Sequence, residues 1–124
     1  MSKSHDIIRY KRGQVWMRKV PNTWEHSEIN DSSVQYNNRP CLIISNDYGN
    51  MSSSIVTVVK ITSVDKGTLE INVNFTNDKE EVNTILCNQI ETISKGELSY
   101  YMFTLSDDIM ERVEKALLKA QGIA

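Results

Sequence analysis

Four polar side chains lie where predicted strands begin or end, and together they could hold a phosphate group. Arg39 stands before Pro40, which biases it towards an extended backbone and places its guanidinium at the start of a buried strand. Thr62 and Ser63 end a second apolar run, and Gln89 ends a third. A guanidinium offers a planar fork of donors, to which hydroxyl and amide groups can add hydrogen bonds. These four residues are our first candidates for a functional site.

The sequence lacks the local motifs of several other enzyme classes. It contains no glycine-rich phosphate loop, no serine nucleophile elbow and no histidine-rich cluster. Cys41 and Cys87 lie far apart, each inside an apolar run, and are expected to be buried and reduced. His5 and His26 stand in polar surroundings. We therefore predict neither a metal site nor a cofactor.

The composition is that of one small domain. The chain has 124 residues, 40% of them hydrophobic, which is enough for one core but too few for two ordinary domains. We expect a single domain over residues 1–124, with 1–9 as a flexible N-terminal extension. No stretch approaches the roughly 18 apolar residues of a membrane span, and the N-terminus lacks the apolar centre of a secretory signal. The sequence therefore predicts a cytoplasmic protein.

The charge is nearly balanced but unevenly distributed. A net charge of −2 argues against a protein that coats nucleic acid over its whole surface. Residues 1–20 nevertheless hold six of the 14 basic residues and one acidic residue. This distribution is compatible with a local basic face and equally with ordinary solvated charges.

Hydrophobic patterns predict a mainly β (α+β) fold. Ser106 as a cap, an apolar stripe after it and Gly122 as a stop predict one C-terminal helix. A turn is expected at Asn46–Asn50. Five or six antiparallel strands should curl into a partly open barrel against the helix. The predicted strands are Gln14–Val20, stopped by Pro21, then Pro40–Ser45, Ser54–Thr62, Leu69–Phe75, Thr84–Ile90 and, at an edge, Tyr100–Phe103.

Several blocks follow one another in a familiar order, namely Arg12–Trp16, Arg39–Asp47, Lys60–Ser63, Ile85–Ile93 and the closing helix. In these blocks, from about Tyr10 to Ile123, the chain resembles the MazF/PemK family of bacterial toxin-antitoxin ribonucleases. The resemblance implies an SH3-like small barrel with a C-terminal helix, an architecture also found in CcdB-type proteins. It further implies a homodimer that cleaves single-stranded RNA, and a cognate antitoxin whose disordered tail crosses the same cleft.

The resemblance also assigns roles to two of the candidates. By position, Arg39 corresponds to the family's catalytic arginine and Thr62 to its catalytic threonine. In metal-free RNA cleavage the ribose 2′-hydroxyl attacks the adjacent phosphorus, and negative charge builds on the non-bridging oxygens. A permanent guanidinium charge and an ordered hydroxyl can stabilise that charge. The need for a 2′-hydroxyl would restrict the substrate to RNA.

Two positions depart from the family pattern. Asn88 stands where many members have Glu or Asp, and Glu91 stands where they have Arg. Asn88 cannot act as a general base, and Glu91 reverses a charge near the expected phosphate unless it points away or accepts the nucleophile's proton. The acid and base therefore stay open, with Glu25, His26 and Glu28 as further candidates.

Residues 22–38 form a long polar stretch without hydrophobic periodicity and are predicted to be a loop. Its Trp24 and Tyr36 could stack on unpaired bases or could pack over the barrel mouth. His26 could equally be an ordinary exposed histidine. Our candidates for RNA contacts are Gln89, Ser63, Trp24, Glu25, His26, Asn88 and Glu91.

Two other functions fit the same architecture. A catalytically silent barrel that binds RNA or an antitoxin-like peptide would explain Asn88 and Glu91. A CcdB-like gyrase poison would share the fold, but those proteins rely on a Trp near the C-terminus, and this chain ends Lys119-Ala120-Gln121-Gly122-Ile123-Ala124. The sequence therefore favours the ribonuclease.

Overall fold

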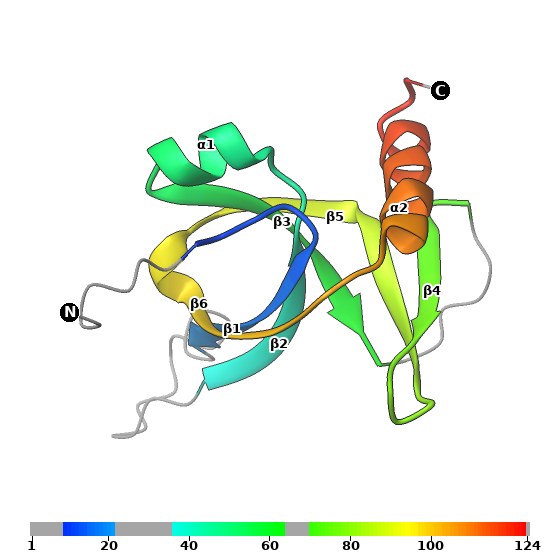
Figure 1. The fold of residues 1–124 in the computed structure, drawn as a ribbon, viewed down its shortest axis with the longest axis horizontal. Helices are drawn as coiled ribbons and strands as arrows, with labels where there is room; N and C mark the ends of the chain where they lie inside the picture. The colour runs from blue at the N-terminus through cyan, green and yellow to red at the C-terminus, as the bar shows by residue number, and fades with distance from the viewer. Residues whose placement is uncertain (1–8, 22–35, 64–69, 124) are drawn as a thin grey trace, which may run out of the picture.

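The computed structural model describes residues 9–21, 36–63 and 70–123, which form one antiparallel sheet and a C-terminal helix (Figure 1). The sheet has six strands in the order β4-β5-β3-β2-β1-β6, so within the described residues β4 and β6 are its edges and it does not close. The elements are β1 Gln14–Pro21, β2 Tyr36–Ile43, α1 Asp47–Ser52, β3 Ile55–Thr62, β4 Asn72–Thr76, β5 Val82–Ser94, η3 Lys95–Glu97, β6 Leu98–Thr104 and α2 Asp107–Ala120.

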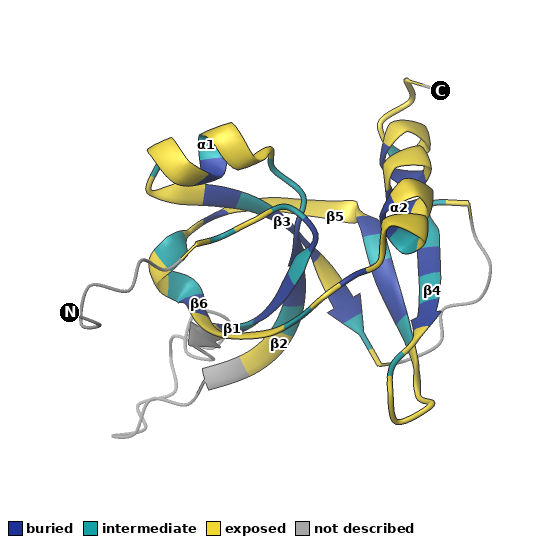
Figure 2. Ribbon diagram, in the orientation of Figure 1, coloured by how far each residue is buried: buried dark blue, intermediate teal, exposed yellow. Residues whose placement is uncertain are grey.

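The central strands are buried on both faces, which explains their nearly continuous apolar sequences. Along β3, Val56 and Val58 join one apolar cluster, while Val59 and Ile61 join the other. One cluster lies between the sheet and α2, and the other lies inside the curve that β1, β2, β3, β5 and β6 make in Figures 1 and 2. The predicted small open barrel with a terminal helix is confirmed.

Helix α2 begins and ends where the sequence predicts. The Ser106 side chain accepts a hydrogen bond from the Ile109 amide, and Gly122 follows the helix with a φ of 77°. The face that packs on the sheet carries Met110, Val113, Ala116 and Leu117. None of the helices in the described residues has the length and apolar character that crossing a membrane requires.

Several predicted boundaries are wrong. Strand β1 runs through Pro21, and β2 begins at Tyr36 rather than Pro40, because the two strands pair continuously from Val15–Leu42 to Pro21–Tyr36. The predicted turn at Asn46–Asn50 is the short helix α1, capped by the Asn46 side chain. Strand β5 is also much longer than predicted and continues to Ser94.

Several predictions fall outside the described residues. These concern His5 and residues 1–8 of the expected extension, and the loop positions Trp24, Glu25, His26 and Glu28. Leu69 lies outside as well, but the fourth predicted strand begins later than expected, because Glu70 and Ile71 form a turn and β4 starts at Asn72. Tyr36 opens β2, but its side chain lies outside the description as well. Their proposed roles therefore stay predictions.

Candidate active site

A pocket of about 450 Å³ opens where β2 and β3 separate. Within the described residues the pairing of β2 with β3 ends at Cys41–Lys60. Beyond that pair, β2 stays paired with β1, with Arg39 opposite Arg18. Strand β3 stays paired with β5, with Thr62 opposite Thr84. The end of β3 and the start of β2 diverge in Figure 1. The pocket lies in this gap and is lined by Asn38, Arg39, Pro40, Lys60, Ile61, Thr62, Ser63, Asn83 and Leu86.

Three of the predicted site residues meet in this pocket. Arg39 and Thr62 each lie two residues beyond the last β2–β3 pair, Cys41–Lys60, and both line the pocket together with Ser63. Arg39 is exposed, and its one hydrogen bond within the described chain is a long one, 3.4 Å from Nη1 to the Asn38 carbonyl. Arg39 lines the pocket, and no carboxylate of the described residues forms a salt bridge with it. Such a site can bind a phosphate.

Asn88 and Gln89 lie outside the lining of this pocket, in an irregular part of β5. Val59 pairs with Ile90 whereas the next residue, Lys60, pairs with Leu86, so the stretch between them has no partner in β3. A bulge of this kind redirects side chains and increases the local twist. Both side chains are exposed. Their predicted RNA contacts stay predictions.

Glu91 is held by an arginine that sequence reasoning did not single out. The Arg18 guanidinium donates to both oxygens of the Glu91 carboxylate at 2.8 and 3.0 Å, and its Nε donates to Glu97 at 2.9 Å. Arg18 is only 6% exposed. These bonds to Arg18 lower the pKa of Glu91, which makes its carboxylate a weaker base. The reversed charge at this position is thus neutralised within the fold.

This ion pair should make stability depend on pH in the acid range. Because its pKa is lower in the folded state, Glu91 contributes stability that is present above its unfolded pKa of about 4.3 and is lost as the pH falls through the folded value. We expect the stability difference between wild type and Glu91→Gln to shrink from pH 5 to pH 3. Urea unfolding at several pH values measures it, and Glu111→Gln on the exposed face of α2 is the control. A difference independent of pH would contradict the assignment.

The two cysteines have no part in this site. Both are free and buried, as predicted. Burial raises the pKa of Cys41 to about 12 and that of Cys87 to about 11, so neither is a thiolate at neutral pH. In the described part of the chain, no group of three or more His, Cys, Asp and Glu side chains is placed to hold a metal ion.

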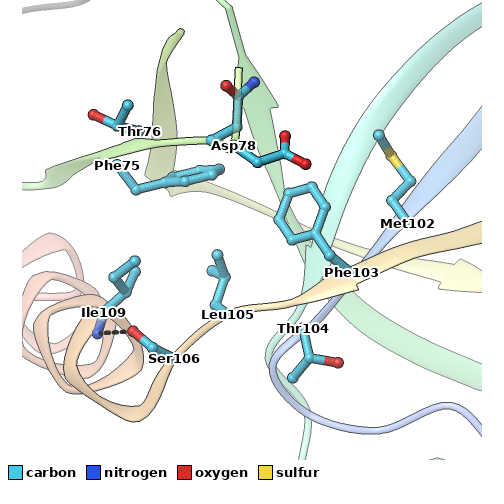
Figure 3. A pocket seen from close by; sticks show the side chains of 10 residues that line it. Phe75, Thr76, Asp78, Met102, Phe103, Thr104, Leu105, Ser106 and Ile109 are labelled. Atoms are coloured by element: carbon cyan, nitrogen blue, oxygen red, sulfur yellow. Dashed lines mark hydrogen bonds between the residues drawn. The ribbon is translucent and has the colours of Figure 1, made fainter. Parts of the chain in front are cut away.

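A second pocket lies between the turn after β4, the end of β6 and the start of α2 (Figure 3). Phe75, Phe103 and Leu105 make much of its wall. Asp78 is the one ionisable side chain among its described lining residues. This pocket offers a phosphate no positive charge, so the gap between β2 and β3 is the stronger candidate for an RNA-cleaving site.

Comparison with known proteins places the chain in a family. The model of the PemK-like, MazF-like toxins of type II toxin-antitoxin systems matches residues 11–120, from before β1 to the end of α2. The chain belongs to this family. The resemblance read from the sequence blocks is confirmed.

One PemK/MazF-family relative and two solved structures are similar to this chain. Endoribonuclease EndoA of Bacillus subtilis is 36% identical over 83 residues, which are 64% of this chain and 72% of EndoA. A mycobacterial endoribonuclease solved with its cognate antitoxin superposes with a TM-score of 0.72 at 24% identity, over 93% of this chain and 97% of that one. A MazE-MazF structure from Deinococcus radiodurans gives 0.75 at 14% identity, over 95% and 100%. These structures share the fold.

Two basic residues of this PemK/MazF-family chain were given no role from the sequence: Lys60, which lines the pocket, and Arg18, which binds Glu91 outside its lining. Lys60 stands two residues before Thr62, and strand alternation alone would have put both on one face. Arg18 is likewise two residues after the buried Trp16. Their partners, however, come from strands distant in the sequence. The alternation was therefore a usable signal for their faces but not for their contacts.

Proposed function

We propose that this PemK/MazF-family chain is the toxin of a toxin-antitoxin system and a metal-independent endoribonuclease that cuts single-stranded RNA at short sequence motifs, with mRNA as its cellular target. The observation that carries the proposal is the convergence of Arg39 and Thr62 on one pocket. The similarity to EndoA, an endoribonuclease, supports RNA cleavage as the class of reaction. Such a target would place the protein in the cytoplasm.

The two residues would act on the charge that develops at phosphorus. The Arg39 guanidinium would bind the non-bridging oxygens, whose charge grows as the 2′ oxygen attacks, and the Thr62 hydroxyl would add a further donor. Ser63, next in the same pocket, offers a second hydroxyl. The reaction would leave a 2′,3′-cyclic phosphate and a 5′-hydroxyl.

The same proposal includes two protein partners, a second copy of the chain and a cognate antitoxin. Large apolar side chains stay exposed on α1, where Tyr48 is 85% and Met51 74% exposed, and on the edge strand β6 at Tyr100 and Tyr101. Exposed groups of this kind are typical of surfaces that bind proteins. A mycobacterial relative has been solved with its antitoxin, which supports the second partner.

Purified protein incubated with single-stranded RNA in excess chelator tests the proposal. We expect discrete fragments that carry 2′,3′-cyclic phosphate and 5′-hydroxyl ends, with single-stranded DNA of the same sequence left intact. Mass spectrometry of the fragments identifies the ends. Tight binding without fragments would instead indicate a silent RNA-binding barrel, and cleavage that returns only with added Mg²⁺ would refute the metal-independent reaction.

A further inference from the structure

Lys60 brings an ammonium group into the same pocket as Arg39 and Thr62. It precedes Thr62 by two residues in β3, so both side chains leave the strand on one face. Its Cα pairs with Cys41 in β2, at the last rung before the strands separate. Lys60 therefore lies at the closed end of the gap that Arg39 and Thr62 line.

The surroundings leave this ammonium group available to a bound ligand. Lys60 is exposed and makes no salt bridge with any described residue. The charge of Lys60 is felt at Glu91, whose pKa is lowered first by the hydrogen bonds from Arg18 and in smaller part by Lys60. The Glu91 carboxylate is bound at both oxygens by Arg18, and Lys60 makes no salt bridge with it.

The proposed reaction needs a proton at the leaving group, and few lining residues can supply one. Arg39 holds its protons too tightly to donate one. The hydroxyls of Thr62 and Ser63 and the amides of Asn38 and Asn83 are poor acids. An ammonium group, in contrast, is a far stronger acid than the alcohol that must form. Among the described lining residues, this leaves Lys60.

We propose that Lys60 is a further catalytic residue, the general acid that protonates the leaving 5′ oxygen. The assignment rests on the RNA cleavage proposed above. The 2′ oxygen forms a bond to phosphorus and releases its proton to water, while the bond from phosphorus to the 5′ oxygen breaks. The departing electron pair takes a proton from Nζ of Lys60. The products are a 2′,3′-cyclic phosphate and a 5′-hydroxyl, and the neutral amine then regains a proton from water.

Replacing the scissile 5′ oxygen by sulfur tests this role, because a thiolate leaves without needing a proton. Single-turnover rates are measured for wild type and Lys60→Ala on the oxygen and the sulfur RNA. We expect the variant to be at least about 100-fold slower on the oxygen RNA and nearly as fast as wild type on the sulfur RNA. Lys60→Arg, which keeps the charge but not a transferable proton, should behave like Lys60→Ala. Lys79→Ala, in the exposed turn after β4, is the control.

The outcomes separate this inference from the proposed function. If Lys60→Ala lowers the cleavage rate equally on both RNAs, Lys60 only contacts the phosphate and is not the acid. An unchanged rate of this variant on the oxygen RNA would also overturn the role as the acid. Arg39→Ala should be slow on both RNAs, which shows that the sulfur RNA still reports on the same site. Absence of cleavage by the wild type would refute the proposed function itself. Circular dichroism checks folding, and Lys60→Met replaces Lys60→Ala if the latter does not fold.

Discussion

Replacing Arg39 with alanine is expected to slow RNA cleavage by about 100- to 1,000-fold while the protein stays folded. The guanidinium would meet charge that is fully developed only in the transition state, so its loss should lower the rate more than the affinity for RNA. Arg39 is exposed, and within the described chain its side chain makes only a long hydrogen bond to Asn38, so truncation leaves no buried partner among the described residues unsatisfied. Single-turnover cleavage of end-labelled RNA in excess chelator measures the effect.

Two variants make this result specific. Arg112→Ala removes the same charge from α2, where the side chain donates to the Asn74 carbonyl, and should leave the cleavage rate within a few-fold of wild type. Arg39→Lys keeps the charge but not the planar fork of donors, so an intermediate rate is expected. Wild-type cleavage by Arg39→Ala would remove Arg39 from the chemistry.

The elements predicted best from the sequence are those whose signal is local. Strand β3 is dense in β-branched residues, and α2 combines an N-terminal serine cap with an apolar stripe. In both cases the local sequence predicts the type of element and also which of its side chains are buried. The burial of β3 on both faces and the buried face of α2 follow directly from those patterns.

Elements stabilised by distant partners escaped prediction. The first residues of β2, Tyr36 and Asn37, have no apolar period, and they form a strand because β1 offers its hydrogen-bonding edge to them. Helix α1 contains Gly49 and several polar residues, which predict a turn. It is held by Asn50, 1% exposed, whose side chain donates to the Ser45 carbonyl. Neither contact has a periodic signature in the sequence.

The candidate site shows the same division. Strand prediction placed Arg39 and Thr62 at strand ends and suggested that they could share a phosphate, but only the resemblance to a family gave them catalytic roles. The structure brings them together in one pocket, just beyond the point where β2 and β3 part. The contact of Arg18 with Glu91 spans 73 residues and crosses between β1 and β5. Strand alternation predicts the face of the sheet on which each side chain lies. Whether two such side chains on distant strands meet depends on how the sheet curves, which the sequence pattern does not predict.

The ion pairs of Arg18 with Glu91 and Glu97 are expected to give the largest effect on stability when they are removed. Replacing Arg18 with methionine should lower the free energy of unfolding by about 2 to 3 kcal/mol, because two carboxylates would then face each other beside an apolar cluster without a cation. The loss should stay below that of a fully buried pair, since the side chains of Glu91 and Glu97 are 44% and 27% exposed and can take up water. Urea unfolding at neutral pH measures it.

Two further variants test whether the unpaired charges are the cause. Lys119→Met breaks a surface pair with Glu70, in which both side chains are well exposed, and should cost less than about 1 kcal/mol. Adding Glu91→Gln and Glu97→Gln to Arg18→Met removes the stranded carboxylates and should recover much of the loss, because an apolar side chain without neighbouring charges suits this position. If the triple variant is no more stable than Arg18→Met alone, packing of the arginine stem rather than charge is what Arg18 contributes.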